Sequence, residues 1–376
     1  MILFLFELLH LGYMNSETRN KNLDGLRATS VILVIFAHSK IKWVPGGLGV
    51  TIFFVLSGYI ITKILYLEFI KFGSINWVNF YMRRFWKIFP PVFFILILPS
   101  FIFWNYCKIQ KQIFISQIFF YYNWIQVSVG SKGVLPGSAV IWSLSIEEQF
   151  YIFIAITGFL VTLGEKKLFK LKLVLLYLSL WFFSTISRIL VSLHNSDLDN
   201  YDETGNLPRI YYGTDTRMSS ICVGALIALL TLNWLPRKDQ VKRQNLVFLV
   251  LGSIGFLFSL IIRDLHFRDS FRYTVQELSI AFVIISGPVL GKWPKLLNAF
   301  MNSRSIQMIG RASYSIYLSH LSIIYLVEQK MFIKNNLSYY AKVAILISLS
   351  LIIGIVLHRI TDAPFENMRQ KYRRVH

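Results

Sequence analysis

Two ionisable side chains, Arg27 and His38, are separated by ten residues in a run that is otherwise almost entirely apolar. An α-helix turns about 100° per residue, so eleven steps return to within ~20° of the starting face and climb about 16 Å. Both side chains would therefore lie on one face, with one near a membrane surface and the other inside. An ionisable group inside a membrane helix is costly and is a functional candidate. Since histidine moves protons well near neutral pH, His38 is the candidate general base.

A pair of adjacent carboxylates, Glu147 and Glu148, lies at the head of an apolar run in the segment WSLSIEEQFY, which begins at Trp142. One interpretation is helix capping, because the macrodipole favours carboxylates at a helix N-terminus. Two carboxylates at a membrane boundary exceed what a cap needs, so we expect a role in a site. Neighbouring side chains on a helix point about 100° apart, which predicts that only one of the pair faces a cavity.

Basic residues gather in the segment YMRRFWKIFPP, where Arg83, Arg84 and Lys87 precede an apolar run. Arg84 and Lys87 are three residues apart and so share a helix face. Guanidinium and ammonium groups bind phosphates well, which predicts an anion site. The alternative is a plain cytoplasmic anchor. The Pro90–Pro91 pair is expected to fix where the following span begins.

Three other segments carry polar or small residues. Tyr317 and His320 share a helix face in the segment SYSIYLSH, where His320 is equally well explained as a core residue or a catalytic one. Asp215 and Arg217 open another apolar run and are expected to pair locally or to face the loop. The stretch 46–62 is rich in small residues, which favours close packing of membrane helices. The alternative is that Gly46, Gly47 and Gly49 line a narrow path.

The composition indicates the kind of scaffold that holds these residues. Hydrophobic residues make up 55% of the 376-residue chain and charged residues 15%, and the mean hydropathy is +0.54. The two cysteines form neither a metal-binding spacing nor a disulfide framework, and we expect no metal. The net charge of +20 does not indicate nucleic-acid binding, because the basic residues cluster between apolar runs as the positive-inside rule requires.

Apolar runs of spanning length predict an all-α integral membrane protein, a bundle of about ten transmembrane helices. The predicted spans are 25–41, 47–65, 88–106, 146–164, 172–193, 216–233, 245–262, 273–290, 306–327 and 341–359. With both termini in the cytoplasm, most basic loops fall inside and the acidic loop after residue 194 falls outside. The segment 111–127 would reverse this order if it crossed, so we expect an interfacial or re-entrant helix followed by a glycine-containing loop.

The predicted domain organisation is simple. Residues 1–20 form an N-terminal segment, residues 21–365 the transmembrane domain, and residues 366–376 a basic cytoplasmic tail. The first thirteen residues lack the features of a signal peptide. They form a short interfacial helix, or else Met14 rather than Met1 is the true start.

Six segments in order carry a resemblance to a known family. NLDGLRATSVILVIFAHS, GVTIFFVLSGYIIT, MRRFWKIFPP, WSLSIEEQFY, TRMSSICVGALIALL and SYSIYLSH resemble the acyltransferase 3 family of membrane O-acyltransferases, and the likeness runs from about residue 20 to residue 365. The resemblance implies transfer of an acyl group, usually acetyl, from cytoplasmic acyl-CoA to a hydroxyl on an extracytoplasmic sugar. Implied acceptors include lipopolysaccharide O-antigen, exopolysaccharide, peptidoglycan and small glycosides. Acyl-CoA would be a co-substrate, and no bound cofactor is implied.

By resemblance, the Arg-x10-His pair of the family falls on Arg27 and His38, and its cytoplasmic Arg-x-x-Arg pair falls on Arg84 and Lys87. The lysine departs from the pattern, which keeps the charge but weakens bidentate phosphate recognition. Some family members carry a fused extracytoplasmic domain, for which this chain is expected to be too short.

The implied chemistry assigns a role to each candidate. His38 would accept the proton of the sugar hydroxyl as it attacks the thioester. Arg27 or Tyr317 would stabilise the oxyanion, while Glu147 or Glu148 would orient His38 or hold the sugar. The nucleotide end of acyl-CoA would contact Arg83, Arg84 and Lys87. Trp142 and His320 would support the site. The expected location is the inner (plasma) membrane. The rival interpretation is a transporter or flippase of a glycan or ion.

Overall fold

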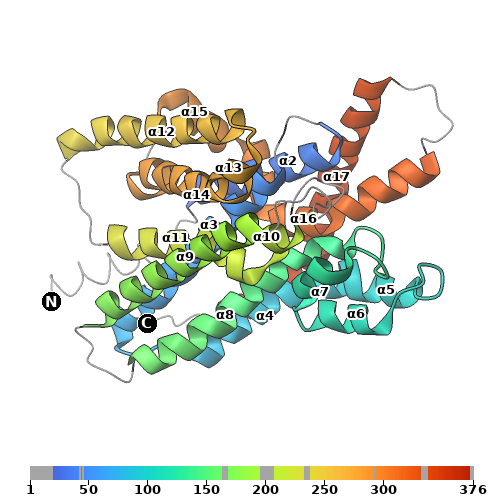
Figure 1. Cartoon of the computed structure of the whole chain (residues 1–376), viewed down its shortest axis with the longest axis horizontal. Helices are drawn as coiled ribbons and strands as arrows, with labels where there is room; N and C mark the ends of the chain where they lie inside the picture. The colour runs from blue at the N-terminus through green and yellow to red at the C-terminus, as the bar shows by residue number, and fades with distance from the viewer. Residues whose placement is uncertain are drawn as a thin grey trace.

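The computed structural model describes residues 20–41, 44, 46–162, 168–194, 207–232, 238–291, 293–331 and 338–372. Every regular element in these ranges is a helix (Figure 1). The predicted N-terminal segment 1–20 lies outside the described residues except for Asn20. Most of the loop after residue 194 and the last four residues of the basic tail also lie outside them.

The helices are given in chain order. They are α2 (Lys21–His38), α3 (Gly46–Phe72), α4 (Trp77–Val92), α5 (Leu98–Ile102), α6 (Lys111–Ile118), α7 (Tyr122–Val129), α8 (Ile141–Thr162), α9 (Phe169–His194), α10 (Pro208–Tyr212), α11 (Thr214–Thr231), α12 (Lys238–Ile261), α13 (Leu265–Asp269), α14 (Phe271–Ile284), α15 (Lys295–Met301), α16 (Arg304–Met331), α17 (Tyr339–Thr361) and α18 (Glu366–Lys371). Short π-helical and 3-10 turns add η1 (Phe93–Ile97), η2 (Ser138–Val140), η5 (Ile285–Val289) and η6 (Ala363–Phe365).

A helix occupies most of each of the ten predicted spans. Six helical stretches within the described residues are long and apolar enough to cross a membrane: Gly46–Phe72, Trp77–Ile102, Ser138–Thr162, Phe169–His194, Arg243–Ile261 and Tyr339–Lys371. The all-helical membrane bundle is therefore confirmed. Helices α2, α11, α14 and α16 are shorter or more polar, because they carry buried groups such as Asp24, Arg217, Glu277 and His320.

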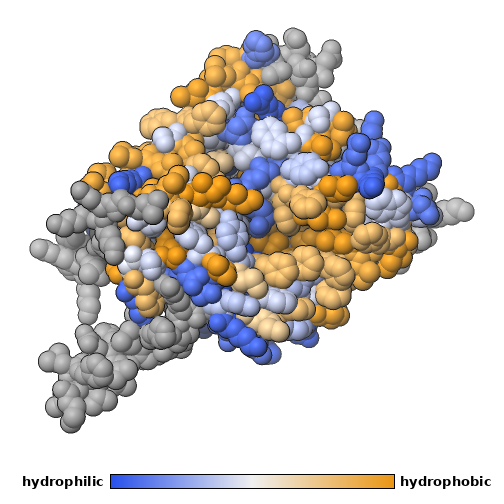
Figure 2. Space-filling view, turned by 90° about the horizontal axis from the view of Figure 1, so that it is seen from below, coloured by the Kyte–Doolittle hydropathy of each residue, from blue (hydrophilic) through white to orange (hydrophobic). Residues whose placement is uncertain are grey.

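Apolar side chains cover much of the outside of the bundle, as a lipid-facing surface requires. Leu190 on α9, Leu257 on α12 and Ile352 on α17 are all exposed, and Figure 2 shows one such face, largely apolar with scattered polar groups. Helix α3 is instead the most enclosed of the six candidate spans. It packs against α2 and α11 in the middle of the molecule.

Glycines bring α3 and α11 into backbone contact. A Cβ atom added at Gly58 would lie 1.9 Å from the carbonyl oxygen of Ile221, and one added at Gly224 would lie 1.9 Å from that of Val55. Neither position has room for any side chain. The prediction that the small-residue stretch 46–62 packs closely is confirmed, and this crossing fixes the centre of the bundle.

We expect substitutions at this crossing to disrupt folding. Gly224→Ala should cost about 1–3 kcal/mol of stability because backbone atoms must move apart, and Gly224→Val should leave little folded protein. The measurement is the thermal stability of the monodisperse peak in detergent size-exclusion chromatography. Leu230→Ala is the control on the same helix, since Leu230 is 61% exposed. Equal stability of Gly224→Ala and the unmodified protein would contradict the proposed packing.

The expectation for Pro90 and Pro91 is wrong. Helix α4 begins at Trp77, where the side chain of Asn76 caps it by accepting from the backbone of Asn79 at 2.9 Å. The helix continues through both prolines and is followed by the π-helical turn η1. The prolines remove two backbone donors but do not end the helix, because the widened turn takes up their steric effect. The basic residues therefore lie within a helix rather than ahead of one.

The segment 111–127 does not cross the bundle. It forms α6 and most of α7, and each is eight residues long, or about 12 Å. The prediction of a non-spanning segment is confirmed. The loop after it contains Gly130, Gly133 and Gly137, all with positive φ. At Gly137 a Cβ atom would collide with the backbone of Ser322 on α16, so this loop is held against the bundle.

Candidate active site

Two pockets lie in the bundle and share a wall. The large pocket has a volume of about 640 Å³ and contains His38. The small pocket has a volume of about 120 Å³ and contains Arg27. Val50 on α3 and Tyr317 on α16 line both of them. Arg27 and His38, which were predicted to share a face of α2, therefore line different pockets: Arg27 the small one and His38 the large one.

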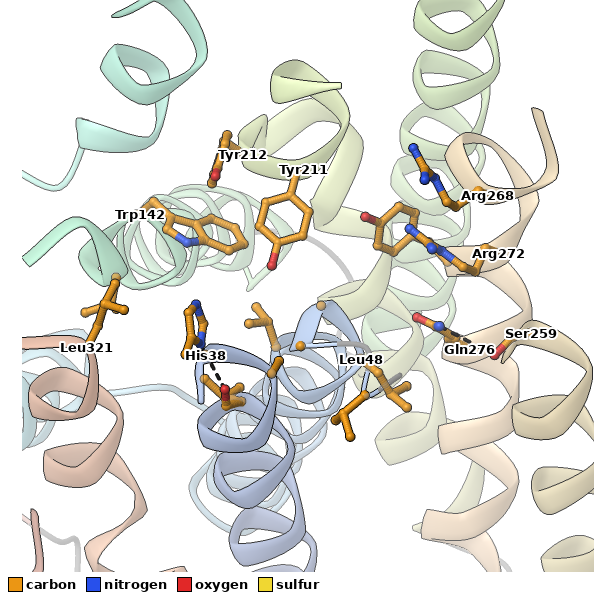
Figure 3. A pocket seen from close by; sticks show the side chains of 18 of the residues that line it. His38, Leu48, Trp142, Tyr211, Tyr212, Ser259, Arg268, Arg272, Gln276 and Leu321 are labelled. Atoms are coloured by element: carbon orange, nitrogen blue, oxygen red, sulfur yellow. Dashed lines mark hydrogen bonds between the residues drawn. The ribbon is translucent and has the colours of Figure 1, made fainter. Parts of the chain in front are cut away.

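The imidazole of His38 is oriented at the end of α2. Its Nδ1 lies 2.8 Å from the carbonyl oxygen of Val34, one turn earlier. A carbonyl oxygen can only accept, so Nδ1 carries the hydrogen and Nε2 keeps its lone pair. Figure 3 shows the second ring nitrogen facing into the large pocket. The geometry thus presents a neutral, proton-accepting nitrogen to whatever the pocket holds.

His320 lies directly behind His38. Its Nδ1 is 2.6 Å from the carbonyl oxygen of Tyr317, and its Nε2 is 3.4 Å from Nδ1 of His38. By the same reasoning Nδ1 of His320 donates to the carbonyl, which leaves its Nε2 as an acceptor for the Nδ1–H of His38. His320 is fully buried, so it is both a core residue and a neighbour of His38.

Aromatic rings form one wall of the large pocket. Trp142, at the start of α8, lies with its ring centroid 5.1 Å from that of Tyr211 and 5.1 Å from that of Tyr212. Aromatic faces of this kind are apolar surfaces with polar edges, which suits the faces of sugar rings. Trp142 was predicted to support the site. The two tyrosines were missed, because the loop before them carries no recognisable pattern.

Tyr317 stands between the pockets through its hydroxyl. That hydroxyl lies 2.7 Å from Oγ of Ser143 and donates to the carbonyl of Val140 at 3.2 Å. Both partners belong to the start of α8 or the turn before it. The hydroxyl is therefore held at a fixed place on the wall that the two pockets have in common.

The small pocket is lined by cations and by one carboxylate. Arg27 lies 3.6 Å from Asp24, and Arg84 and Arg311 line the pocket as well. The carboxylate is Glu147, which accepts a hydrogen bond from Tyr151 at 3.0 Å. This is the only Asp or Glu among the described residues lining the small pocket.

The two adjacent carboxylates have different surroundings. Glu147 lines the small pocket and Glu148 lines neither pocket, which confirms that only one of the pair faces a cavity. Oε1 of Glu148 is buried without a hydrogen-bond partner in the described part of the chain. Helix α8 begins at Ile141, six residues before Glu147, so the capping interpretation is wrong. The residue that contacts His38 is His320 rather than either glutamate.

Lys87 lines the small pocket, but its ammonium is already engaged. Nζ lies 2.6 Å from Oδ2 of Asp362 on the connection from α17 to α18. The same carboxylate also binds Arg369 at 2.6 Å and His358 at 2.9 Å. The sequence did not indicate this cluster, because Lys87 and Asp362 are 275 residues apart. Lys87 is thus a structural cation at the edge of the pocket.

Arg83 and Arg84 point in different directions, as adjacent residues on a helix must. Arg83 donates to the backbone carbonyl of Tyr372 at 2.8 Å and to Glu68 at 3.4 Å, and it does not line the small pocket. Arg84 lines the pocket, with its guanidinium 5.6 Å from the ring centroid of Tyr151. Of the predicted anion-binding residues, Arg84 has the best placement.

Asp215 and Arg217 were expected to pair locally or to face the loop, which is confirmed for Asp215 and wrong for the buried Arg217. Asp215 binds Arg209 at 2.9 Å. Arg217 is fully buried, donates to Oγ1 of Thr51 at 3.2 Å, and lies 4.3 Å from the ring centroid of Tyr273. The two side chains are two residues apart on α11 and face opposite ways, because neighbours at that spacing do not meet.

The described part of the chain contains no group of three or more His, Cys, Asp or Glu side chains able to hold a metal ion. The arrangement offers a histidine in the large pocket, cations in the small pocket, and a tyrosine hydroxyl on the wall between them.

Comparison with known proteins gives a consistent picture. A family model described as an acyltransferase domain matches residues 20–359. A protein named as an O-acetyltransferase in Staphylococcus aureus strain COL is 31% identical over 365 residues, which cover 91% of this chain and 56% of the relative. O-acetyltransferase OatA of S. aureus strain NCTC 8325 is 29% identical over 358 residues, with the same coverage. The chain therefore spans about half the length of the curated relatives it matches.

Proposed function

The chain belongs to the acyltransferase 3 family, and on this premise we propose that it transfers an acetyl group from cytoplasmic acetyl-CoA to a hydroxyl of a cell-surface glycan. The observation that carries the proposal is the pair of pockets with a common wall at Tyr317. The donor and the acceptor of such a reaction lie on opposite sides of the membrane. Two pockets that meet at one wall would allow them to react without either one crossing.

The small pocket is assigned to the donor. Acetyl-CoA carries several phosphate charges at its nucleotide end, and guanidinium groups bind phosphate well. Arg27, Arg84 and Arg311 line this pocket. The positive-inside distribution of basic loops supports a cytoplasmic location for this end of the bundle and for both chain termini. The thin acyl end of the donor then extends toward Tyr317.

The large pocket is assigned to the acceptor. A sugar hydroxyl near Nε2 of His38 gives up its proton to that nitrogen as its oxygen attacks the thioester carbonyl carbon. The tetrahedral oxyanion accepts a hydrogen bond from the hydroxyl of Tyr317, whose single hydrogen turns from the carbonyl of Val140 to the oxyanion. Its collapse forms the ester and breaks the carbon–sulfur bond, and the proton held by His38 goes to the CoA thiolate. During this step the Nδ1–H of the charged His38 faces two acceptors, Val34 O and His320 Nε2.

The assignment of the small pocket predicts a selective kinetic defect. Arg84→Ala should raise the KM for acetyl-CoA about 10–100-fold, the value of one charge-assisted hydrogen bond, and leave the KM for the glycan near its original value. Steady-state kinetics on purified protein in vesicles measure both constants. Arg83→Ala is the adjacent control, expected to keep the KM for acetyl-CoA because Arg83 lies outside the pocket. The reverse pattern would remove Arg84 from the donor site.

The function itself is tested on whole cells. Mass spectrometry of surface glycans from cells with and without the gene should show the loss of acetyl groups in its absence. Complementation with the His38→Gln variant should not restore them. Normal acetylation combined with altered export of the glycan would instead support a transporter and overturn the proposal.

A further inference from the structure

The large pocket contains three arginines that the proposed chemistry does not use. Arg263 follows α12, Arg268 lies in α13 and Arg272 in α14, and all three line the pocket. Figure 3 shows Arg268 and Arg272 at one end of the pocket and His38 at the other, with the aromatic wall between them. No Asp or Glu lines this pocket in the described part of the chain. Its far end is therefore strongly cationic.

The neighbouring carboxylates do not neutralise this cluster completely. Nε of Arg268 lies 3.4 Å from Oδ1 of the buried Asp269, so this arginine is partly compensated. Asp264 uses its Oδ1 to cap α13, accepting from the backbone of Phe267 at 2.8 Å. Neither carboxylate forms an ion pair with Arg263 or Arg272 among the described contacts.

Arg272 has the surroundings of a binding residue. It is half-buried, and its guanidinium lies 5.4 Å from the ring centroid of Tyr273, which also lines the pocket. Next to it, the amide of Gln276 donates to Oγ of Ser259 at 3.4 Å (Figure 3). A guanidinium held over a ring, beside an amide and a hydroxyl, offers an anion several donors from a fixed direction. Arg263 is exposed and adds a further positive charge to the lining of the same pocket.

We propose that the acceptor is an acidic glycan, which carries a phosphate or a carboxylate on a sugar unit next to the one that is acetylated. This inference rests on the proposed function, because it takes the large pocket as the acceptor site. The hydroxyl to be acetylated lies at His38, the sugar rings lie along Trp142 and Tyr211, and the anion binds Arg272 with help from Arg263 and Arg268. A neutral glycan would bind there without an anion to pair with the half-buried Arg272.

The experiment uses the full chain in phosphatidylcholine vesicles, which have no anionic headgroup to fill the site. Radiolabelled acetyl-CoA is the donor. The acceptors are surface glycans from cells lacking the gene, separated by anion exchange into neutral, carboxylate-containing and phosphate-containing fractions. We expect label in one of the two acidic fractions, which also identifies the anion, and little label in the neutral fraction.

Variants then connect the preference to the arginines. Arg272→Gln and Arg263→Gln should each raise the KM for the acidic acceptor, Arg272→Gln by about 10–100-fold, with kcat nearly unchanged because neither residue touches the reacting atoms. Arg272→Lys should recover part of the affinity, and added salt should weaken binding of the acidic acceptor. Arg209→Gln is the matched control. Arg209 is exposed, pairs with Asp215 and does not line the pocket.

The outcomes separate this inference from the proposed function. Equal transfer to the neutral fraction, or an unchanged KM in both arginine variants, would overturn the acidic acceptor and leave the acetyltransferase in place. Label in none of the fractions would overturn the proposed function and this inference with it.

Discussion

Replacing His38 by glutamine is expected to reduce acetyl transfer at least about 100-fold, the usual contribution of a positioned general base. The glutamine amide can still donate to the carbonyl of Val34, which His38 contacts at 2.8 Å, but it cannot take a proton. The protein should therefore fold and insert normally while kcat falls. The measurement is the initial rate of acetyl transfer in vesicles, normalised to the monodisperse protein peak.

Two controls accompany this variant. His266→Gln should keep full activity, because His266 is exposed and does not line the large pocket. His320→Ala should cause a milder loss than His38→Gln, because His320 only faces the far side of the His38 ring at 3.4 Å. If His38→Gln retained a near-normal rate while His320→Ala were inactive, His320 rather than His38 would be the base.

Replacing Tyr317 by phenylalanine is expected to lower kcat about 100-fold, as the loss of one oxyanion donor does in other acyl-transfer enzymes. The hydroxyl is held by Ser143 at 2.7 Å and by Val140 at 3.2 Å on the wall common to both pockets. The ring remains in Tyr317→Phe, so both pockets should keep their shape and both KM values should change little. Rapid-quench measurement of a single turnover isolates this chemical step.

The matched control is Tyr325→Phe on the same helix. Tyr325 is exposed and lines neither pocket, so its rate should not change. A normal single-turnover rate for Tyr317→Phe would remove the hydroxyl from the chemistry.

The sequence predicted the helices well because membrane insertion imposes a length and a composition on each one. It also predicted that Glu147 and Glu148 would have different surroundings, because helix geometry fixes the angle between neighbours. Pro90 and Pro91 were misjudged, since the cost of proline inside a helix depends on whether the next turn can widen. That turn is η1, and its residues carry no signal of it.

Contacts between segments far apart in the chain could not be predicted from the sequence. The pairing of Lys87 with Asp362 and the placement of His320 behind His38 join residues 275 and 282 positions apart. The arginines of the large pocket belong to no motif that the sequence displays. Nothing in their spacing indicates that the end of α12, α13 and α14 lie over the same cavity as the end of α2.

The common wall at Val50 and Tyr317 has an electrical consequence. If both pockets admit water, the insulating layer between the two solutions is only about one side chain thick at this point, and the membrane voltage falls across it. Each elementary charge moved through 100 mV changes the free energy by about 2.3 kcal/mol. The proposed transfer moves no net charge through this barrier, because a proton goes inward while the acyl group that replaces it on the glycan oxygen goes outward. The equilibrium of acetylation is therefore independent of the resting voltage, even though donor and acceptor are on opposite sides of the membrane.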